Sequence, residues 1–468
     1  MLELSFDTDR GIPLVDQIVD ALRQRIDDRL LRPGAQVPPI RRFAESHGVS
    51  RFTVVEAYDR LVALGYLTSR RGSGFYVASR KAPAADGAPA PIDRAVDVVW
   101  LLRQGFDNPE GNKLKAGSGW LPRAWMEDEA IRRNLRTLSR REDVTLTGYG
   151  TPEGYLPLRQ QLQLKLADLG VAADPGQIIL TLGATQALEL AAHHFIRPGD
   201  CVFVDDPGYW TLFGNLRLHG AQLVGVPRTQ DGPDVAAMRE LLQHHQPKAF
   251  FTHSVLHNPT ATNISAAAAH QVLKLAEQHD FVVVEDDTYS DFQSQPTPRL
   301  AALDQLERVI YVGSFSKTLS ANFRVGFLAC RPDLAADLAD AKLLTSLPTP
   351  EFAERLVYQM LIEGQYRKYI DRLHGRLAEA TGKTLRMLER VGLEPYTEPK
   401  GGMFVWAKAP HLADAAPLAR QAATAGIMLA PGNVFRPQMQ PSPWLRFNVA
   451  QADNPGLEGF LSEALATV

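Results

Sequence analysis

The sequence predicts a multidomain protein in which a small, mainly helical N-terminal domain with a β-hairpin precedes a large α/β domain. Three observations predict this class. The chain has 468 residues, too many for one ordinary domain. Residues 1–80 show apolar positions at helical spacing followed by two short strand-like runs. From residue 178 onward, short apolar strands alternate with helices, which is typical of a parallel sheet covered on both faces.

The composition is that of an ordinary globular protein and excludes several classes. With 50 Lys and Arg against 53 Asp and Glu, the net charge is −3, so nucleic-acid binding would need a local basic patch. Cys201 and Cys330, both among apolar residues, argue against a disulfide scaffold or a metal site and fit a reducing compartment. No apolar run approaches the roughly 20 residues of a membrane span, and we expect a cytoplasmic protein with no membrane partner.

Residues 1–80 are predicted to form a helix-turn-helix followed by a hairpin. Ser50 is a good N-cap for the third helix, and Gly65 stands where a C′ glycine is expected. This arrangement is a winged helix-turn-helix, whose second motif helix enters the major groove of DNA while the hairpin touches the backbone or minor groove. The expected elements are a helix from Pro13 to the break at residues 32–34, helices over about 40–45 and 51–64, and strands over 66–69 and 75–78.

Positive charge is concentrated on this domain. Residues 41–80 contain seven arginines and no lysine, against three acids. Arginine pairs bidentately with guanine edges and with phosphates, so these side chains indicate DNA contact. A basic face on a protein-interaction module is the alternative. The predicted DNA contacts are Arg41, Ser50, Arg51, Thr53, Arg70, Arg71 and Gly72.

Five stretches in this domain resemble the GntR-type DNA-binding domain, and the resemblance covers most of residues 11–78. The chain departs from the family at Pro39, where a serine that could touch phosphate is usual, while the following arginine is kept as Arg41. The stretches are Arg-Pro-Gly at 32–34, Val-Pro-Pro-Ile-Arg at 37–41, Gly-Val-Ser-Arg-Phe-Thr-Val-Val-Glu-Ala-Tyr at 48–58, Leu-Gly-Tyr-Leu at 64–67 and Gly-Ser-Gly at 72–74.

An alanine- and proline-rich segment separates the two parts of the chain. Residues 81–96 have no apolar periodicity over their first part and are predicted to be a linker of intermediate stiffness. Residues 97–468 form the second part. We expect its large domain over about 145–345 and its small domain over about 346–468, together with the segment before 145.

Lys317 is the centre of the predicted chemistry of the second part. It is framed by Ser314 and Ser316 and followed by Arg324, a set that suits a phosphorylated aldehyde. A deprotonated lysine can form a Schiff base with that aldehyde. The implied cofactor is pyridoxal phosphate (PLP). A solvated surface lysine is the alternative unless other PLP contacts exist.

Those contacts follow the ends of other predicted strands. The Gly183-Ala184-Thr185 run opens a helix, so its N–H groups and hydroxyl can hold phosphate. Alternation places Asp286 on the face of Val282 and Val284, where a carboxylate can keep the pyridine nitrogen protonated. Each residue taken alone could be a turn, a core aromatic or a strand cap. The remaining candidates are Tyr209 for ring stacking, and Asn258 and Tyr289 for the phenolic oxygen.

The same set resembles the class I and II aminotransferases of PLP fold type I, from about residue 100 to the C-terminus. The resemblance implies a transferase fold with a small C-terminal α+β subdomain. It also implies that Lys317 is the Schiff-base residue, assisted by Asp286 and Tyr289, and that the phosphate is held by Ala184, Thr185, Ser314 and Arg324. Tyr149 matches a tyrosine that reaches the neighbouring subunit's phosphate, which implies a homodimer. Arg446 matches the clamp for the α-carboxylate of an amino acid.

A GntR-type domain joined to an aminotransferase-like domain resembles the MocR-type regulators. The resemblance implies a PLP-dependent transcription regulator that binds operator DNA and senses PLP, an amino acid or an amine through aldimine exchange. A working aminotransferase with an accessory DNA-binding domain is the alternative, because the catalytic set is intact. A DNA-binding protein that has kept the fold without the cofactor is a third possibility. The sequence leaves open the effector, the operator, and activation versus repression.

Overall fold

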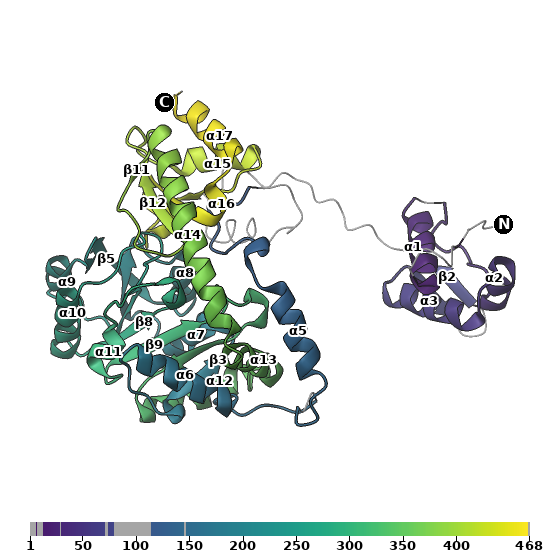
Figure 1. Ribbon diagram of the computed structural model, residues 1–468, viewed down its shortest axis with the longest axis horizontal. Coiled ribbons are helices and arrows are strands. Elements are labelled where there is room, and N and C mark those ends of the chain that lie inside the picture. Colours follow the sequence, from purple (N-terminus) through teal and green to yellow (C-terminus); the bar gives the residue numbers. More distant parts are fainter. Residues whose placement is uncertain are drawn as a thin grey trace. The chain divides into compact units, whose positions relative to one another are not determined.

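The computed structural model describes Phe6 and residues 13–28, 30–70, 74–78, 114–144 and 147–466. The chain divides into two compact units, Met1–Arg94 and Ala95–Val468 (Figure 1). The predicted linker over 81–96 lies outside the described residues, as do Arg71, Gly72 and the side chain of Arg70. Among the described residues, no helix is both long enough and apolar enough to cross a membrane.

The N-terminal unit has the predicted winged helix-turn-helix architecture. The side chain of Ser50 accepts a hydrogen bond from the N–H of Thr53 at 3.0 Å and so begins α3. Gly48, with φ of 65°, ends α2 in the left-handed conformation that glycine adopts easily. The elements are α1 Leu14–Asp27, α2 Ile40–His47, α3 Arg51–Ala63, β1 Leu67–Arg70 and β2 Gly74–Val77, and the two strands form an antiparallel hairpin.

A mixed eight-stranded sheet forms the centre of the second unit. Its strand order is β3-β10-β9-β8-β7-β4-β5-β6, with β4, β5, β7, β8 and β9 paired in parallel. The predicted parallel sheet is confirmed for these five strands, but β10 pairs antiparallel with both β9 and β3, and β6 pairs antiparallel with β5. The short loop that carries Lys317 joins β9 directly to β10, and so short a connection permits only an antiparallel return. The strands are β3 Ile178–Thr181, β4 Cys201–Asp206, β5 Gln222–Thr229, β6 Gly232–Pro233, β7 Ala249–Thr252, β8 Val282–Asp286, β9 Val309–Ser314 and β10 Gly326–Ala329.

Helices cover both faces of this sheet, as the alternating pattern predicted. Successive strand residues enter two different cores: Val284 packs with one set of helices and Val283 with the other. The first face is covered by α7 Gly183–Phe195, α8 Trp210–Leu218 and α12 Pro332–Ser346. The second is covered by α6 Leu156–Asp168, α9 Val235–Leu241, α10 Ala266–Gln278, α11 Leu300–Asp304 and α13 Glu351–Ile362, with α5 Asp128–Leu138 against α13.

A smaller α+β domain is built on a four-stranded antiparallel sheet with the order β11-β12-β14-β13. The long helix α14, Gln365–Arg390, runs from this domain down to the large one (Figure 1). The segment around Leu114 joins it, because Gly117 N–H donates to Met428 at 2.7 Å. The other elements are β11 Glu394–Pro395, β12 Phe404–Lys408, α15 Ala416–Thr424, β13 Ala430–Pro431, β14 Trp444–Asn448, α16 Val449–Ala452 and α17 Pro455–Ala466.

Candidate functional site

A cavity of about 430 Å³ lies where the carboxyl ends of the central strands meet residues of the small domain. The fold thus brings together side chains that are more than 250 residues apart in sequence, from Ala184 to Arg446. The lining residues that sequence reasoning had singled out are Ala184, Thr185, Tyr209, Asn258, Asp286, Tyr289, Ser314, Ser316, Lys317, Arg324 and Arg446. Gly183 and Tyr149 do not line the cavity, although Gly183 lies next to Arg324, which does.

Lys317 lies on the loop between β9 and β10 and faces the cavity. Its Nζ donates a hydrogen bond to the carbonyl oxygen of Gly119 at 2.8 Å. Burial lowers the pKa of Lys317 to about 8, and the positive charges of Arg446 and Arg324 act in the same direction against the attraction of Asp286. A substantial fraction of this amine is therefore neutral near physiological pH, as a nucleophilic lysine requires.

Asp286 ends β8 and is the strand's one carboxylate that lines the cavity. Its Oδ2 lies 2.9 Å from Nε2 of His253, and its Oδ1 accepts the N–H of Thr288 at 3.0 Å. Burial opposes ionisation, but His253 and Thr288 outweigh it and lower the pKa of Asp286. Glu285 and Asp287 bind other partners: Glu285 accepts two backbone N–H groups, and Asp287 pairs with Arg299 at 3.0 Å.

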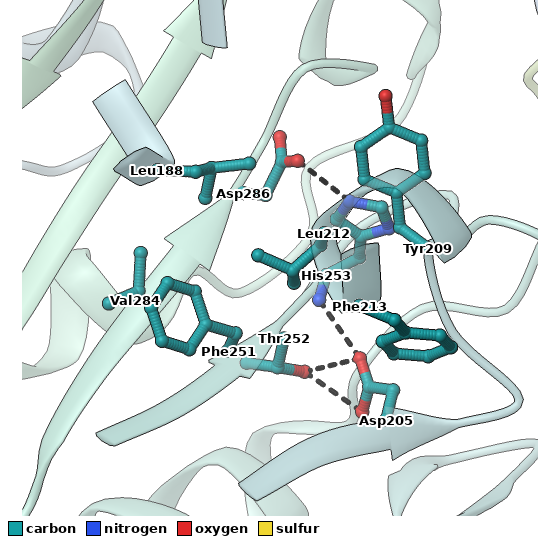
Figure 2. A pocket seen from close by; sticks show the side chains of 10 residues that line it. All are labelled: Leu188, Asp205, Tyr209, Leu212, Phe213, Phe251, Thr252, His253, Val284 and Asp286. Carbon is teal, nitrogen blue, oxygen red and sulfur yellow. Dashed lines mark hydrogen bonds and ion pairs between the residues drawn. The ribbon is translucent and has the colours of Figure 1, made fainter. Parts of the chain in front are cut away.

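Behind Asp286 lies a buried polar layer that sequence reasoning missed. Figure 2 shows His253 between Asp286 and Asp205, with the ring of Tyr209 beside it. The backbone N–H of His253 donates to Asp205 at 3.1 Å, and Asp205 is paired with Arg228 at 3.1 Å. Burial and Arg228 lower the pKa of His257, which also faces Asp205, to about 3, so its ring is neutral. The sequence feature that could have identified His253 is its position directly after β7, because other site residues also follow the ends of strands.

An anion-binding cradle occupies one end of the cavity. The backbone N–H groups at the start of α7 lie beside the hydroxyls of Thr185, Ser314 and Ser316. Arg324 donates to the carbonyl oxygen of Leu182 at 2.7 Å and lies 3.4 Å from the Ser316 hydroxyl. A Cβ on Gly183, whose φ is +77°, would lie 2.6 Å from Nη2 of Arg324. Glycine at this position therefore allows the guanidinium to reach the helix N-terminus.

Arg446 on β14 occupies the opposite wall and is 2% exposed. It donates to Oδ1 of Asn258 and to the carbonyl oxygen of Gly117, both at 2.7 Å. Its Nε has no hydrogen-bond partner within the described ranges, and no carboxylate there forms an ion pair with it. Burial lowers the pKa of Arg446 to about 10, so the group remains a cation at neutral pH. A buried cation without a counterion is suited to binding an anionic group.

Tyr289 and Asn258 lie between these two ends. Burial raises the pKa of Tyr289 well above its ordinary value, so its hydroxyl stays protonated and can donate a hydrogen bond. The remaining candidate, Tyr149, is 82% exposed on the surface of the protomer.

Of the predicted DNA contacts that the structure describes, Arg41, Ser50 and Arg51 are exposed and Thr53 is half-buried, and the two arginines share an acidic neighbour. Nε of Arg41 lies 2.9 Å from Oε1 of Glu45, and Nη2 of Arg51 lies 3.8 Å from the same oxygen. Both arginine side chains are more than 60% exposed, so these pairs are weak and can exchange for a stronger anion. The hydroxyls of Ser50 and Thr53 lie 2.8 Å apart at the start of α3.

Two known families cover most of the chain. Residues 14–77 match the gntR family of bacterial regulatory proteins, and residues 112–463 match class I and II aminotransferases. MocR of Rhizobium meliloti is 29% identical over 80% of this chain and 77% of MocR. The chain belongs to the MocR-type group of GntR regulators. As in that group, a DNA-binding domain precedes an aminotransferase-like domain.

Relatives of this MocR-type chain fall into two sets. The HTH-type transcriptional regulator YdcR of Escherichia coli is 28% identical over 93% of this chain and 94% of YdcR. The 2-aminoadipate transaminase of Thermus thermophilus is 32% identical but covers 73% of this chain. The crystal structure of LysN, an α-aminoadipate aminotransferase from Thermus thermophilus complexed with N-(5′-phosphopyridoxyl)-L-leucine, has a TM-score of 0.71 and 28% identity, over 78% of this chain and 95% of LysN. The relatives that span both domains carry the names of regulators, which supports regulation over the alternative of a working aminotransferase.

Proposed function

We propose that this protein is a PLP-dependent transcription regulator whose second unit senses PLP together with an amino acid or amine. One observation carries the proposal. In a chain that also contains a DNA-binding domain, a lysine with a lowered pKa, a buried carboxylate and a buried arginine that has no carboxylate partner among the described residues line the same cavity. Perturbed titratable groups that converge in a cavity are the mark of a ligand or reaction site.

The donor set fits PLP. The start of α7, with Thr185, Ser314, Ser316 and Arg324, would hold the phosphate, and the ionised Asp286 would pair with a protonated pyridine nitrogen. Asn258 and Tyr289 would contact the phenolic oxygen, and Tyr209 would lie against the ring. When bound, PLP supplies an aldehyde that reacts reversibly with primary amines. Lys317 is the neutral amine that this chain provides for it.

Arg446 suits the carboxylate of an amino-acid effector. Its present partners, Asn258 and Gly117, are both neutral, so the guanidinium keeps its full charge for a ligand. A carboxylate bound there would place the amino group of the same molecule on the side of the cavity that holds Lys317. The effector would therefore compete with Lys317, and its arrival would change contacts between the large and small domains.

We also propose a homodimer in which Tyr149 reaches the phosphate site of the other subunit. Tyr149 is 82% exposed in the protomer, although tyrosine is a partly apolar side chain. A Cβ on Gly150 would lie 3.3 Å from Cβ of Glu351, so this loop borders the start of α13. Phe352, which follows Glu351, and Leu347, four residues before it, are also exposed. An apolar surface of this kind beside Tyr149 is consistent with a subunit interface.

Competition gel shifts test the proposal. Fragments of the source genome would compete with random DNA for the protein in PLP alone and in PLP with a panel of amino acids and amines. We expect a preferred fragment, with affinity that changes about 5- to 150-fold when the right effector is present, the range of ordinary allosteric coupling. The alternative, a working aminotransferase, predicts turnover at about 1 s⁻¹ or more and no sequence preference. Failure to prefer any fragment under every condition would contradict regulation.

A further inference from the structure

Two apolar side chains lie on the outer face of α3, the second helix of the helix-turn-helix. Phe52 is 77% exposed and Val55 is 37% exposed. They are not part of the core of the domain, because α3 packs into that core through four other side chains, Val54, Ala57, Tyr58 and Leu61. Since Phe52 and Val55 are three residues apart, they are neighbours on one face of the helix.

A single exposed apolar residue is common and needs no explanation. Phe52, however, is a large aromatic residue, it lies in the first turn of α3, and it is the most exposed of the helix's large apolar side chains. Val55 extends the same apolar surface by one turn. The helix that a helix-turn-helix presents to its ligand therefore carries an exposed apolar surface, and such surfaces often mark interaction sites.

The charges on α3 indicate which kind of ligand would cover this surface. Near Phe52 the net charge is positive, since Arg41 and Arg51 share a single acid, Glu45, and the N-terminal end of the helix dipole adds to it. Further along the helix, Arg60 is paired with Asp16 at 2.7 Å and Glu56 at 2.9 Å, so its charge is neutralised. Only the N-terminal half of the outer face therefore attracts a polyanion, and this half carries Phe52 and Val55.

The N-terminal residues of such a helix are the ones that reach base edges in the major groove. The base edges there present hydrogen-bonding groups and one apolar group, the C5-methyl of thymine, which phenylalanine can contact. We propose that Phe52, with Val55 one turn further along α3, reads thymines in the operator by packing against their methyl groups. This inference rests on the proposed DNA-binding function and assigns to it a specificity residue.

Removing the methyl group from the DNA tests the proposal directly. In a duplex that the protein prefers, each thymine would be replaced singly by deoxyuridine, which keeps the base pair and deletes the methyl. We expect wild-type binding, measured by fluorescence anisotropy at fixed salt, to weaken roughly fourfold at one or two positions, the factor for exposing one buried methyl group. Phe52→Ala should bind the original and the substituted duplex equally at one of these positions, and Val55→Ala should do so at its neighbour.

Two further variants keep the test interpretable. Phe52→Leu retains an apolar contact and should keep part of the methyl dependence even if Phe52→Ala binds too weakly to measure. Leu64→Ala is the matched control, because Leu64 is 50% exposed at the other end of α3 and should respond to deoxyuridine as the wild type does. Thermal unfolding of each variant checks that the fold is unchanged.

The outcomes separate this inference from the function it rests on. Wild-type binding that ignores every deoxyuridine would overturn the role of Phe52 while leaving regulation intact. The same holds if Phe52→Ala keeps the full methyl dependence, or if it changes only the oligomeric mass, which would assign Phe52 to contact with a second copy of the chain. A wild type without any sequence preference would contradict the proposed function itself.

Discussion

At the scale of single residues, function depends on which ionisable groups the fold leaves charged and which it leaves neutral. Burial acts on Lys317, Asp286 and Arg446 alike. The hydrogen-bond acceptors of Lys317 and Arg446 are neutral oxygens, whereas His253 and Thr288 lower the pKa of Asp286 and favour its ionised form. The cavity therefore contains a carboxylate that stays ionised beside a lysine that loses its proton readily. That combination suits a cofactor with a protonated pyridine nitrogen and an aldehyde.

The pKa of Lys317 predicts how PLP uptake depends on pH. Because this pKa is lowered to about 8, the neutral amine should become about tenfold more abundant per pH unit below 8 and level off above it. The rate of uptake by the apoprotein, followed by absorbance in stopped flow, should follow that curve. Lys317→Ala is the control and should show no such step, nor any borohydride-reducible adduct, while its circular dichroism is unchanged. If the rate of PLP uptake by the wild type still rises tenfold between pH 9 and pH 10, the pH dependence does not come from Lys317.

Asp286 and Asp287 are adjacent carboxylates with different predicted roles. Asp286→Ala should weaken retention of PLP on dialysis, because it removes the charge facing the pyridine nitrogen. Asp287→Ala should instead lower the free energy of unfolding by about 3–5 kcal/mol, because it leaves the buried Arg299 without its partner. Urea unfolding and PLP content per folded molecule distinguish the two effects. Equal loss of PLP in both variants, at equal stability, would show that the roles are wrongly assigned.

At the scale of elements, the recognition that we propose depends on α3 and on the loops at the strand ends. The helix begins where Ser50 caps it, so Arg51 lies in its first turn, whereas Arg60 lies nine residues later and is occupied by Asp16 and Glu56. Two arginines of one helix thus have different tasks. The first is available to DNA, and the second ties α3 to α1.

This difference predicts opposite results for two matched substitutions. Arg51→Ala should weaken operator binding by about 1–3 kcal/mol if Arg51 contacts a base edge, and should relax specificity at one position. Arg60→Ala should leave operator affinity near that of the wild type and slightly lower the thermal stability of the domain. Anisotropy titrations at several salt concentrations measure the first effect. Loss of operator affinity in Arg60→Ala alone would show that α3 presents a different face to DNA.

At the scale of the whole molecule, two compact units share one chain, and regulation requires that they influence each other. If effector binding changes operator affinity, operator binding must change effector affinity by the same factor. We expect the effector concentration that half-saturates the PLP spectrum to shift by that factor when operator DNA is added. Arg51→Ala, tested at the same DNA concentration, should remove the shift without altering the PLP spectrum. A spectrum that titrates identically with and without operator would contradict coupling.

From the sequence we predicted the order of the domains, the helix-turn-helix with its hairpin, and most of the residues that line the cavity. These features could be predicted because they depend on local spacing: an N-cap before a helix, or a polar residue directly after an apolar strand. The tertiary structure alone decided how those residues are paired. It shows that β10 runs antiparallel, that His253 rather than solvent faces Asp286, that Asp16 lies beside Arg60, and that Arg446 is buried with no carboxylate partner among the described residues. Pairing and burial depend on contacts between residues far apart in the chain, which local patterns do not specify.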